Sequence, residues 1–213
     1  MGLFVKKPIE LRRNLPYTVA IATNTKLIIG LGNPGKQYVL SRHNLGFMAV
    51  DRFALDNEFE PWQKSKKFKG LVAEKTLGST RVILLKPDTF MNLSGEAALA
   101  LSSFYHIDIA DTVAVYDELS IPFGQIRSRI GGQAAGHNGV KSLIELLGEN
   151  FGRVRIGIKN ELSEKAEATD FVLSNLMKSE QSALTDLLGE VNGLLTEFVF
   201  GSQLPTDTRQ LIH

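Results

Sequence analysis

Short apolar runs that end at a glycine or a polar residue alternate along this chain with segments of helical periodicity. Residues 26–30 form one such run and open into a glycine-rich loop, and residues 112–116 form another that stops at Asp117. Between them, residues 94–105 are rich in alanine and leucine and carry Glu96 in the first turn, which is typical of a helix. Interleaved strands and helices predict one α/β domain. We expect a mixed, mostly parallel sheet with helices on both faces, in a three-layer α/β/α arrangement.

The spacing of the apolar residues predicts where the individual elements lie. The stretch Leu77-Gly78-Ser79-Thr80 predicts a hairpin turn, which puts some antiparallel pairing into the sheet. Ser41 is a suitable N-cap for the helix that follows it. The expected strands are 26–30, 68–76, 81–85, 112–116, 125–130 and 154–158, and the expected helices are 41–59, 94–105, 138–147 and 179–200.

The first 25 residues differ in composition from the rest of the chain. Lys6, Lys7, Arg12 and Arg13 outweigh the single acid Glu10, and two prolines interrupt any helical periodicity. No apolar segment follows the basic start, so we do not expect a secretory signal, while an organelle transit segment stays open. We therefore expect a basic extension over residues 1–25 and one domain over residues 26–213. No apolar run reaches the ~18 residues of a membrane span, and the chain has no cysteine, so we expect no membrane partner and no thiol chemistry.

Three loops far apart in the sequence each place an asparagine beside glycines or at the end of a strand. They are Gly30-Leu31-Gly32-Asn33-Pro34-Gly35, Phe90-Met91-Asn92-Leu93-Ser94-Gly95 and Gly136-His137-Asn138-Gly139. The amide of asparagine offers a donor and an acceptor without charge, so a cluster of asparagines can hold a water and a carbonyl group at once. The first loop also matches the Gly-x-Gly-x-x-Gly dinucleotide fingerprint. Because its Pro34-Gly35 pair makes a turn instead of starting a helix, we do not expect a dinucleotide there.

Taken together, these loops resemble those of the bacterial-type peptidyl-tRNA hydrolase family, and the resemblance runs from about Lys26 to the C-terminus. The family motif Thr-Arg-His-Asn-x-Gly is matched by Ser41-Arg42-His43-Asn44-Leu45-Gly46, with serine in place of threonine, and its Phe-Met-Asn-x-Ser-Gly motif is matched in full. Two positions depart from the pattern: Ser120 stands where the family usually has aspartate, and Ala135 where it usually has glycine. The resemblance implies hydrolysis of the ester bond between peptide and tRNA, which releases the tRNA for reuse.

The resemblance also implies roles for individual residues. His43 corresponds to the family's catalytic histidine, Asp117 to its carboxylate partner, and Tyr38 to the contact with the 3′-terminal nucleotide. The residues expected to bind the substrate in the pocket are Asn33, Tyr38, Met91 and Asn138. Core packing is an alternative for Met91, and for His137 we favour a structural role in its loop.

The chemistry of ester hydrolysis supports the same assignment. Water is a poor nucleophile at neutral pH, but a histidine, with an ordinary pKa of ~6.5, can take its proton. A carboxylate on the other ring nitrogen fixes the tautomer and stabilises the imidazolium that forms, so His43 and Asp117 suit the roles of base and partner. The tetrahedral oxyanion needs a hydrogen-bond donor, for which we choose the Asn92 amide. Because the sequence has neither a cysteine nor a Gly-x-Ser-x-Gly motif, direct attack by water is simpler than a covalent intermediate.

The basic residues predict where the tRNA lies. Arg127 and Arg129 share one face of the strand 125–130, and together with Lys141 and Arg155 they predict a surface for the phosphates of the acceptor stem. The acidic segment 161–168 is expected to be a loop over the peptide groove. We expect a monomer without cofactor that binds the acceptor stem and 3′ end of peptidyl-tRNA. It would work in the cytoplasm, or in an organelle stroma or matrix if residues 1–25 are a transit segment.

Two other functions stay open at this point. A metal-dependent hydrolase could use His43, Asp117 and His137, although no local His-x-x-x-His spacing supports a metal site and we expect none. A non-catalytic RNA-binding relative of the same fold would be expected to have lost His43 or Asp117, and both residues are present.

Overall fold

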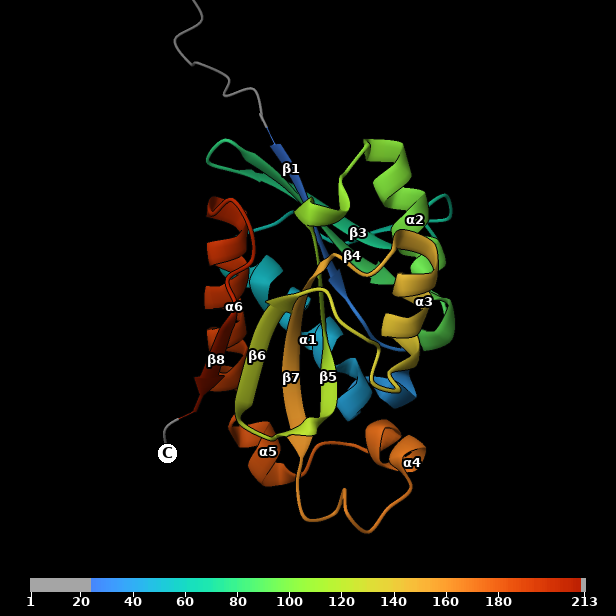
Figure 1. The fold of residues 1–213 in the computed structure, drawn as a ribbon, viewed down its shortest axis with the longest axis vertical. Helices are drawn as coiled ribbons and strands as arrows, with labels where there is room; N and C mark the ends of the chain where they lie inside the picture. The colour runs from blue at the N-terminus through green and yellow to red at the C-terminus, as the bar shows by residue number, and fades with distance from the viewer. Residues whose placement is uncertain (1–23, 212–213) are drawn as a thin grey trace, which may run out of the picture.

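One mixed β-sheet between two layers of helices makes up the computed structural model, which describes residues 24–211 (Figure 1). The predicted N-terminal extension lies outside the described residues, except for Asn24 and Thr25, which belong to the first strand. None of the helices between residues 24 and 211 combines the length and the apolar character that a membrane crossing requires.

Strands and helices alternate over most of the described chain. The strands are β1 (Asn24–Gly30), β2 (Gln63–Ser65), β3 (Gly70–Leu77), β4 (Thr80–Pro87), β5 (Thr112–Pro122), β6 (Gln125–Ile130), β7 (Gly152–Lys159) and β8 (Asp207–Gln210). The α-helices are α1 (Leu45–Asp56), α2 (Ser94–Tyr105), α3 (Asn138–Leu147), α4 (Ala168–Leu173), α5 (Lys178–Ser182) and α6 (Leu184–Phe200). Short 3₁₀ turns are η1 (Lys36–Tyr38), η2 (Arg42–Asn44), η3 (Met91–Leu93) and η4 (Ile109–Asp111).

The sheet of the described residues has the strand order β2-β3-β4-β1-β5-β7-β6-β8. The four central strands, β4, β1, β5 and β7, run parallel to one another. Antiparallel strands flank them on both sides, with the predicted β3–β4 hairpin on one side and β6 and β8 on the other. A single α/β domain with a mixed sheet is therefore confirmed, but parallel pairing is confined to the centre of the sheet.

The side chains of β1 show why the sheet carries helices on both faces. Ile28 lies in an apolar core that includes residues of α1 and α6, whereas Leu27 and Ile29 lie in a second core with residues of α2 and α3. All three side chains are fully buried. A strand that is buried on both faces needs a continuous apolar sequence, and this is the pattern of residues 26–30. The predicted three-layer arrangement is confirmed.

The carboxyl ends of the parallel strands lie at one edge of the sheet. The chain leaves β1 toward Asn33, leaves β4 toward Met91 and Asn92, and passes Asp117 within β5. Loops that follow neighbouring parallel strands meet at such an edge. The topology therefore brings together three motifs that are far apart in the sequence.

Several predicted boundaries are wrong. The helix expected over 41–59 begins with the 3₁₀ turn η2, and Ser41 is not its side-chain cap, because the Ser41 hydroxyl donates to the Tyr38 carbonyl at 2.8 Å. The helix expected over 179–200 is divided at Ala183, where a ψ of −7° interrupts the α conformation. The strand expected to end before Asp117 continues to Pro122, with an irregular register after Glu118. Its last residues include polar side chains, so the apolar pattern did not predict them.

Three short elements were not predicted. β2 and β8 have three and four residues and lie at the two edges of the sheet, and α4 has six residues. Such elements are too short and too polar to show a clear apolar period. The contacts that hold them become visible only in the folded chain.

Gly46 provides a stability prediction, because α1 crosses the sheet at this residue with almost no space. A Cβ added there would overlap the Val115 carbonyl oxygen and would lie 2.5 Å from the backbone N and O of Leu31. None of these backbone atoms can move aside easily, so Gly46→Ala should lower the free energy of unfolding by about 2 kcal/mol or more. Urea denaturation followed by circular dichroism measures this change.

Gly189 is the matched control for that measurement. It lies exposed within α6, and nothing lies within 4 Å of an added Cβ. Gly189→Ala should therefore raise the free energy of unfolding by up to about 1 kcal/mol, through helix propensity alone. Equal effects of the two substitutions would contradict the close packing of α1 on β1 and β5.

Candidate active site

A pocket of about 650 Å³ opens at the edge of the sheet where the three loops meet. Further residues of its lining come from β5, from the turn before α3 and from α4. The predicted site residues that line it are Asn33, Tyr38, His43, Met91, Asn92, Asp117 and Asn138. The structure therefore places all seven predicted pocket residues around one cavity.

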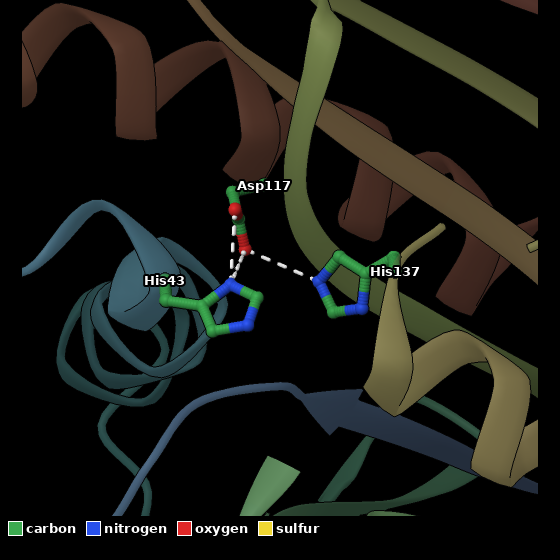
Figure 2. A group of neighbouring side chains, drawn as sticks. All are labelled: His43, Asp117 and His137. Atoms are coloured by element: carbon green, nitrogen blue, oxygen red, sulfur yellow. Dashed lines mark hydrogen bonds and ion pairs between the residues drawn. The ribbon is translucent and has the colours of Figure 1, made fainter. Parts of the chain in front are cut away.

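His43 and Asp117 form a buried pair at the bottom of this pocket (Figure 2). The His43 Nδ1 atom lies 2.9 Å from Oδ1 and 3.1 Å from Oδ2 of Asp117. Because a carboxylate accepts hydrogen bonds, the proton of a neutral His43 belongs on Nδ1. The second ring nitrogen, Nε2, then carries a lone pair and points away from the carboxylate.

His137 approaches the same carboxylate from the other side (Figure 2). Its Nε2 lies 3.2 Å from Asp117 Oδ1, while its Nδ1 accepts hydrogen bonds from the backbone N–H groups of Gly139 and Val140. The imidazole thus serves as the N-cap of α3, as the predicted structural role requires. It also contacts Asp117, which the sequence did not predict, because only the fold brings the two loops together. Since Nδ1 is an acceptor, the proton of a neutral His137 belongs on Nε2 and points at Asp117.

The environment of Asp117 keeps this carboxylate ionised. Burial by itself would raise its pKa, since a charged group loses its hydration there. The charge of His43 and the hydrogen bonds from His137 and His43 outweigh the burial and hold the pKa of Asp117 well below its usual range. Asp117 therefore stays ionised and accepts a hydrogen bond from each of the two rings.

Asn33 connects two of the converging loops. Its side-chain oxygen accepts a hydrogen bond from the backbone N–H of Met91 at 2.9 Å. Its backbone N–H donates to Asn44 Oδ1, and its carbonyl accepts from Asn44 Nδ2, at 2.8 and 3.0 Å. Among residues 24–211, no hydrogen bond engages the Asn33 Nδ2, so this donor is left for a ligand.

The other polar residues of the pocket differ in exposure. Asn92 and Asn138 are exposed, so both amides are open to a ligand in the pocket. Met91 is buried and belongs to the core that includes residues of α2 and α3, as the alternative of core packing requires, and it also lines the pocket.

The two departures from the family pattern are accommodated locally. The Ser120 hydroxyl donates to Glu118 Oε1 at 2.8 Å, and the Ser120 backbone N–H also points to this oxygen. Ala135 has a φ of 47°, in the left-handed region where glycine is more common. Neither change displaces His43, Asp117 or Asn138 from the pocket lining.

A helix, and not the predicted acidic loop, lines the pocket in this region. The pocket residues of this region are Ala168, Thr169, Val172 and Leu173, all in α4. Residues 161–167 form the predicted loop, but of the segment 161–168 only Ala168 lines the pocket. The wall is a short helix with apolar side chains.

The predicted basic surface lies outside the pocket. Arg127 of β6 and Arg155 of β7 are paired in register, and Arg129 lies two residues from Arg127 on the same side of β6. Burial lowers the pKa of the Arg155 guanidinium, and the neighbouring charge of Arg129 lowers it further. Within the described part of the chain, the Nε atoms of Arg129 and Arg155 are buried without a hydrogen-bond partner. Positively charged guanidinium groups thus lie close together here, and two of their Nε atoms have no hydrogen-bond acceptor.

Three ionisable residues of the site, His43, Asp117 and His137, lie close enough to be considered as metal ligands. A neutral histidine that binds a metal through one nitrogen carries its proton on the other and donates it to an acceptor. His137 cannot do so, because its Nδ1 faces two backbone N–H donors. The set therefore does not fit a three-ligand metal site.

Comparison with known proteins gives a consistent result. A family model described as peptidyl-tRNA hydrolase matches residues 27–210. The peptidyl-tRNA hydrolase of Paracoccus denitrificans is 47% identical over 163 residues, which cover 76% of this chain and 68% of the relative. That of Listeria welshimeri is 47% identical over 157 residues, which cover 73% of this chain and 83% of the relative.

A solved structure extends the likeness to the fold. The crystal structure of peptidyl-tRNA hydrolase from Acinetobacter baumannii superimposes with a TM-score of 0.77 and 33% sequence identity, and the match covers 84% of this chain and 90% of that one. Fold and sequence therefore agree: the chain belongs to the peptidyl-tRNA hydrolase family.

Proposed function

We propose that this chain hydrolyses the ester bond between the peptide and the tRNA of peptidyl-tRNA, with His43 as the general base for a water molecule. The name of the family and of its relatives supports the activity. The observation that carries the mechanism is the contact of His43 Nδ1 with both oxygens of Asp117, at 2.9 and 3.1 Å. This contact leaves the basic Nε2 for a water in the pocket.

The reaction then proceeds by direct attack of water. Nε2 of His43 takes a proton while the water oxygen adds to the ester carbonyl, and the ionised Asp117 stabilises the imidazolium that forms. An exposed amide on η3, that of Asn92, donates to the oxyanion of the tetrahedral intermediate. The imidazolium returns the proton to the ribose oxygen as the C–O bond breaks, which releases the peptide acid and the tRNA.

The remaining pocket residues position the substrate. The Asn33 Nδ2 and the Asn138 amide are suited to the main chain of the peptide, since amides bind any peptide backbone without regard to its side chains. Tyr38 on η1 is suited to the 3′-terminal nucleotide, and Met91 supplies an adaptable apolar wall. Substrate binding by these groups would depend little on the peptide sequence.

The arginine surface is suited to the acceptor stem. RNA helices are recognised largely through phosphates and 2′-hydroxyl groups, and Arg127, Arg129 and Arg155 offer guanidinium groups on adjacent strands. Lys141 extends the surface onto α3, where it is exposed. One chain supplies all of these groups, so we further propose a monomer that acts in the cytoplasm, or in an organelle stroma or matrix if residues 1–25 are a transit segment.

The first functional prediction concerns the base. His43→Ala should reduce kcat by about 10²–10⁴-fold, the usual contribution of a general base. Asp117→Asn should lose a large part of this, because an asparagine amide facing Nδ1 would hold the proton on Nε2, the wrong tautomer for a base. Single-turnover hydrolysis of peptidyl-tRNA by purified, folded variants measures both effects.

A second histidine outside the pocket serves as the control for these variants. His106 is exposed at the end of α2 with a φ of 53°, which asparagine tolerates. His106→Asn should therefore leave kcat unchanged. If His43→Ala hydrolyses the substrate as fast as His106→Asn does, His43 is not the base.

The second functional prediction concerns metal. Hydrolysis should survive exhaustive dialysis against a strong chelator, because His43 can activate water by itself and His137 is protonated toward Asp117. The substrate should be a peptide ester on a bare nucleoside, since tRNA itself needs Mg²⁺ to fold. Loss of activity that returns only with added Zn²⁺ or Mn²⁺ would favour the metal-dependent alternative.

The third functional prediction separates tRNA binding from bond cleavage. Arg129→Ala should raise KM and flatten the plot of log binding constant against log salt concentration by about 0.7–0.9 for each phosphate that the variant no longer neutralises. Its kcat should stay near the wild-type value, and the nucleoside ester should be hydrolysed normally. These quantities come from steady-state kinetics at several salt concentrations.

Arg52→Ala is the matched control for Arg129→Ala. Arg52 lies on α1, where it pairs with Asp56 on the opposite side of the sheet from α2 and α3. Its removal should leave the salt dependence unchanged. A kcat that falls equally on both substrates in Arg129→Ala, with the salt dependence intact, would place the tRNA elsewhere.

A further inference from the structure

A buried ion pair holds the pocket wall next to the catalytic histidine. Arg42, the residue before His43, is 1% exposed, and Glu180 of α5 is 3% exposed. Arg42 Nη2 donates to Glu180 Oε2 at 2.6 Å. Charged residues are almost never buried this deeply unless they are paired, so this contact is a fixed part of the fold.

The same carboxylate also holds both ends of one segment of the chain. Residues 160–177, here called the strap, leave the sheet after β7, form α4 and return to α5 (Figure 1). At the start of the strap, Asn160 Nδ2 donates to Glu180 Oε1 at 2.7 Å. At its end, the backbone N–H of Met177 donates to Glu180 Oε2, also at 2.7 Å. Glu180 therefore closes the strap into a loop.

Arg42 fixes the second half of the strap as well. Its Nη1 donates to Ser174 Oγ and to the Asn175 carbonyl, each at 2.7 Å. Its guanidinium lies over the ring of Phe171, 4.5 Å from the centroid. Phe171 belongs to α4 and is buried, so the position of α4 depends directly on the residue beside His43.

Other residues of α4 form the apolar wall of the pocket. Val172 and Leu173 line the cavity together with Leu119 of β5. These side chains are suited to an apolar group of the substrate. The arginine surface on β6 and β7 lies outside the pocket, and an apolar wall cannot bind phosphates, so the side chain of the esterified amino acid is the fitting occupant.

We propose that Arg42 and Glu180 are positioning residues that hold the strap, and with it the apolar wall, at a fixed distance from His43 and so determine how tightly the enzyme binds the side chain of the esterified residue. The proposal rests on the proposed function, since it assumes that the ester lies at His43. It adds a determinant of binding that contacts neither the reacting atoms nor the tRNA.

Asn160→Asp tests this role without removing the buried pair. The new side chain keeps the oxygen that accepts from the backbone N–H groups of Leu162 and Ser163. It replaces the donor that faces Glu180 by a carboxylate oxygen, which repels Glu180 and releases one end of the strap. With N-acetyl-phenylalanyl-tRNA, KM should rise about tenfold, the size expected when one hydrogen bond to a charged group is removed, and kcat should stay near wild type.

The substrate series shows whether the wall or the general fold is affected. N-acetyl-glycyl ester on the same tRNA has no side chain to contact the wall, so its KM should change less than about twofold. Amide hydrogen exchange in residues 161–173 should become faster in the variant. The double variant Asn160→Asp with Glu180→Gln should restore KM, because the glutamine amide can donate to the new carboxylate.

Two further variants complete the test. Arg42→Lys keeps the charge opposite Glu180 but cannot hold Ser174 and Asn175 at once, so it should give the same pattern of KM values. Asn192→Asp is the matched control: Asn192 Nδ2 also donates to a carboxylate, Asp56 Oδ2 at 2.8 Å, but between α6 and α1, and neither residue lines the pocket. It should change neither KM nor hydrogen exchange in the strap.

The proposal is overturned if KM rises equally for the phenylalanyl and glycyl substrates, or if the strap loosens without any change in KM. A fall in kcat with unchanged KM would also overturn it. None of these outcomes depends on which group removes the proton from water. Failure of the proposed mechanism, seen as normal turnover in His43→Ala, is thus distinguishable from failure of this proposal.

Discussion

The carboxylate of Asp117 is the group on which the rest of the site depends. It lies in the middle of the sheet, almost without access to water, where an unpaired charge would be very costly. Two imidazole rings offset this cost because each points an N–H group at the carboxylate. His43 does so from η2, and His137 does so from the turn before α3. Both segments must therefore reach the same point on β5. The arrangement that makes the buried charge tolerable also fixes the tautomer of each ring.

This requirement explains why the surrounding backbone is so tightly constrained. α1 must cross β1 and β5 closely for His43 to reach Asp117, and Gly46 leaves room for only a hydrogen atom there. At the other ring, the backbone N–H groups at the start of α3 hold His137 Nδ1. The same side chain thus caps a helix and donates a hydrogen bond to the buried carboxylate of Asp117.

The polar groups of the pocket and the arginines of the sheet occupy different places. The pocket lining contains the carboxylates of Asp117 and Glu118, several amides and an apolar wall, whereas the arginines of β6 and β7 form a separate surface. Arg42 and Arg153 differ from the arginines of this surface because both are buried, and Arg42 holds the strap through Glu180, Ser174 and Asn175.

The sequence by itself determined the α/β class, the hairpin, the helices 94–105 and 138–147, and the seven pocket residues of the motifs. Apolar periodicity and motif spacing are properties of short stretches of the chain, so they can be recognised without knowledge of the fold. The tertiary structure alone decided what depends on contacts between distant segments. These are the short edge strands β2 and β8, the wall formed by α4, the second role of His137, and the pairing of Arg42 with Glu180. In each case the partners are far apart in the chain, and the hydrogen bonds or packing that give them their roles exist only once the parallel strands have brought their loops to one edge of the sheet.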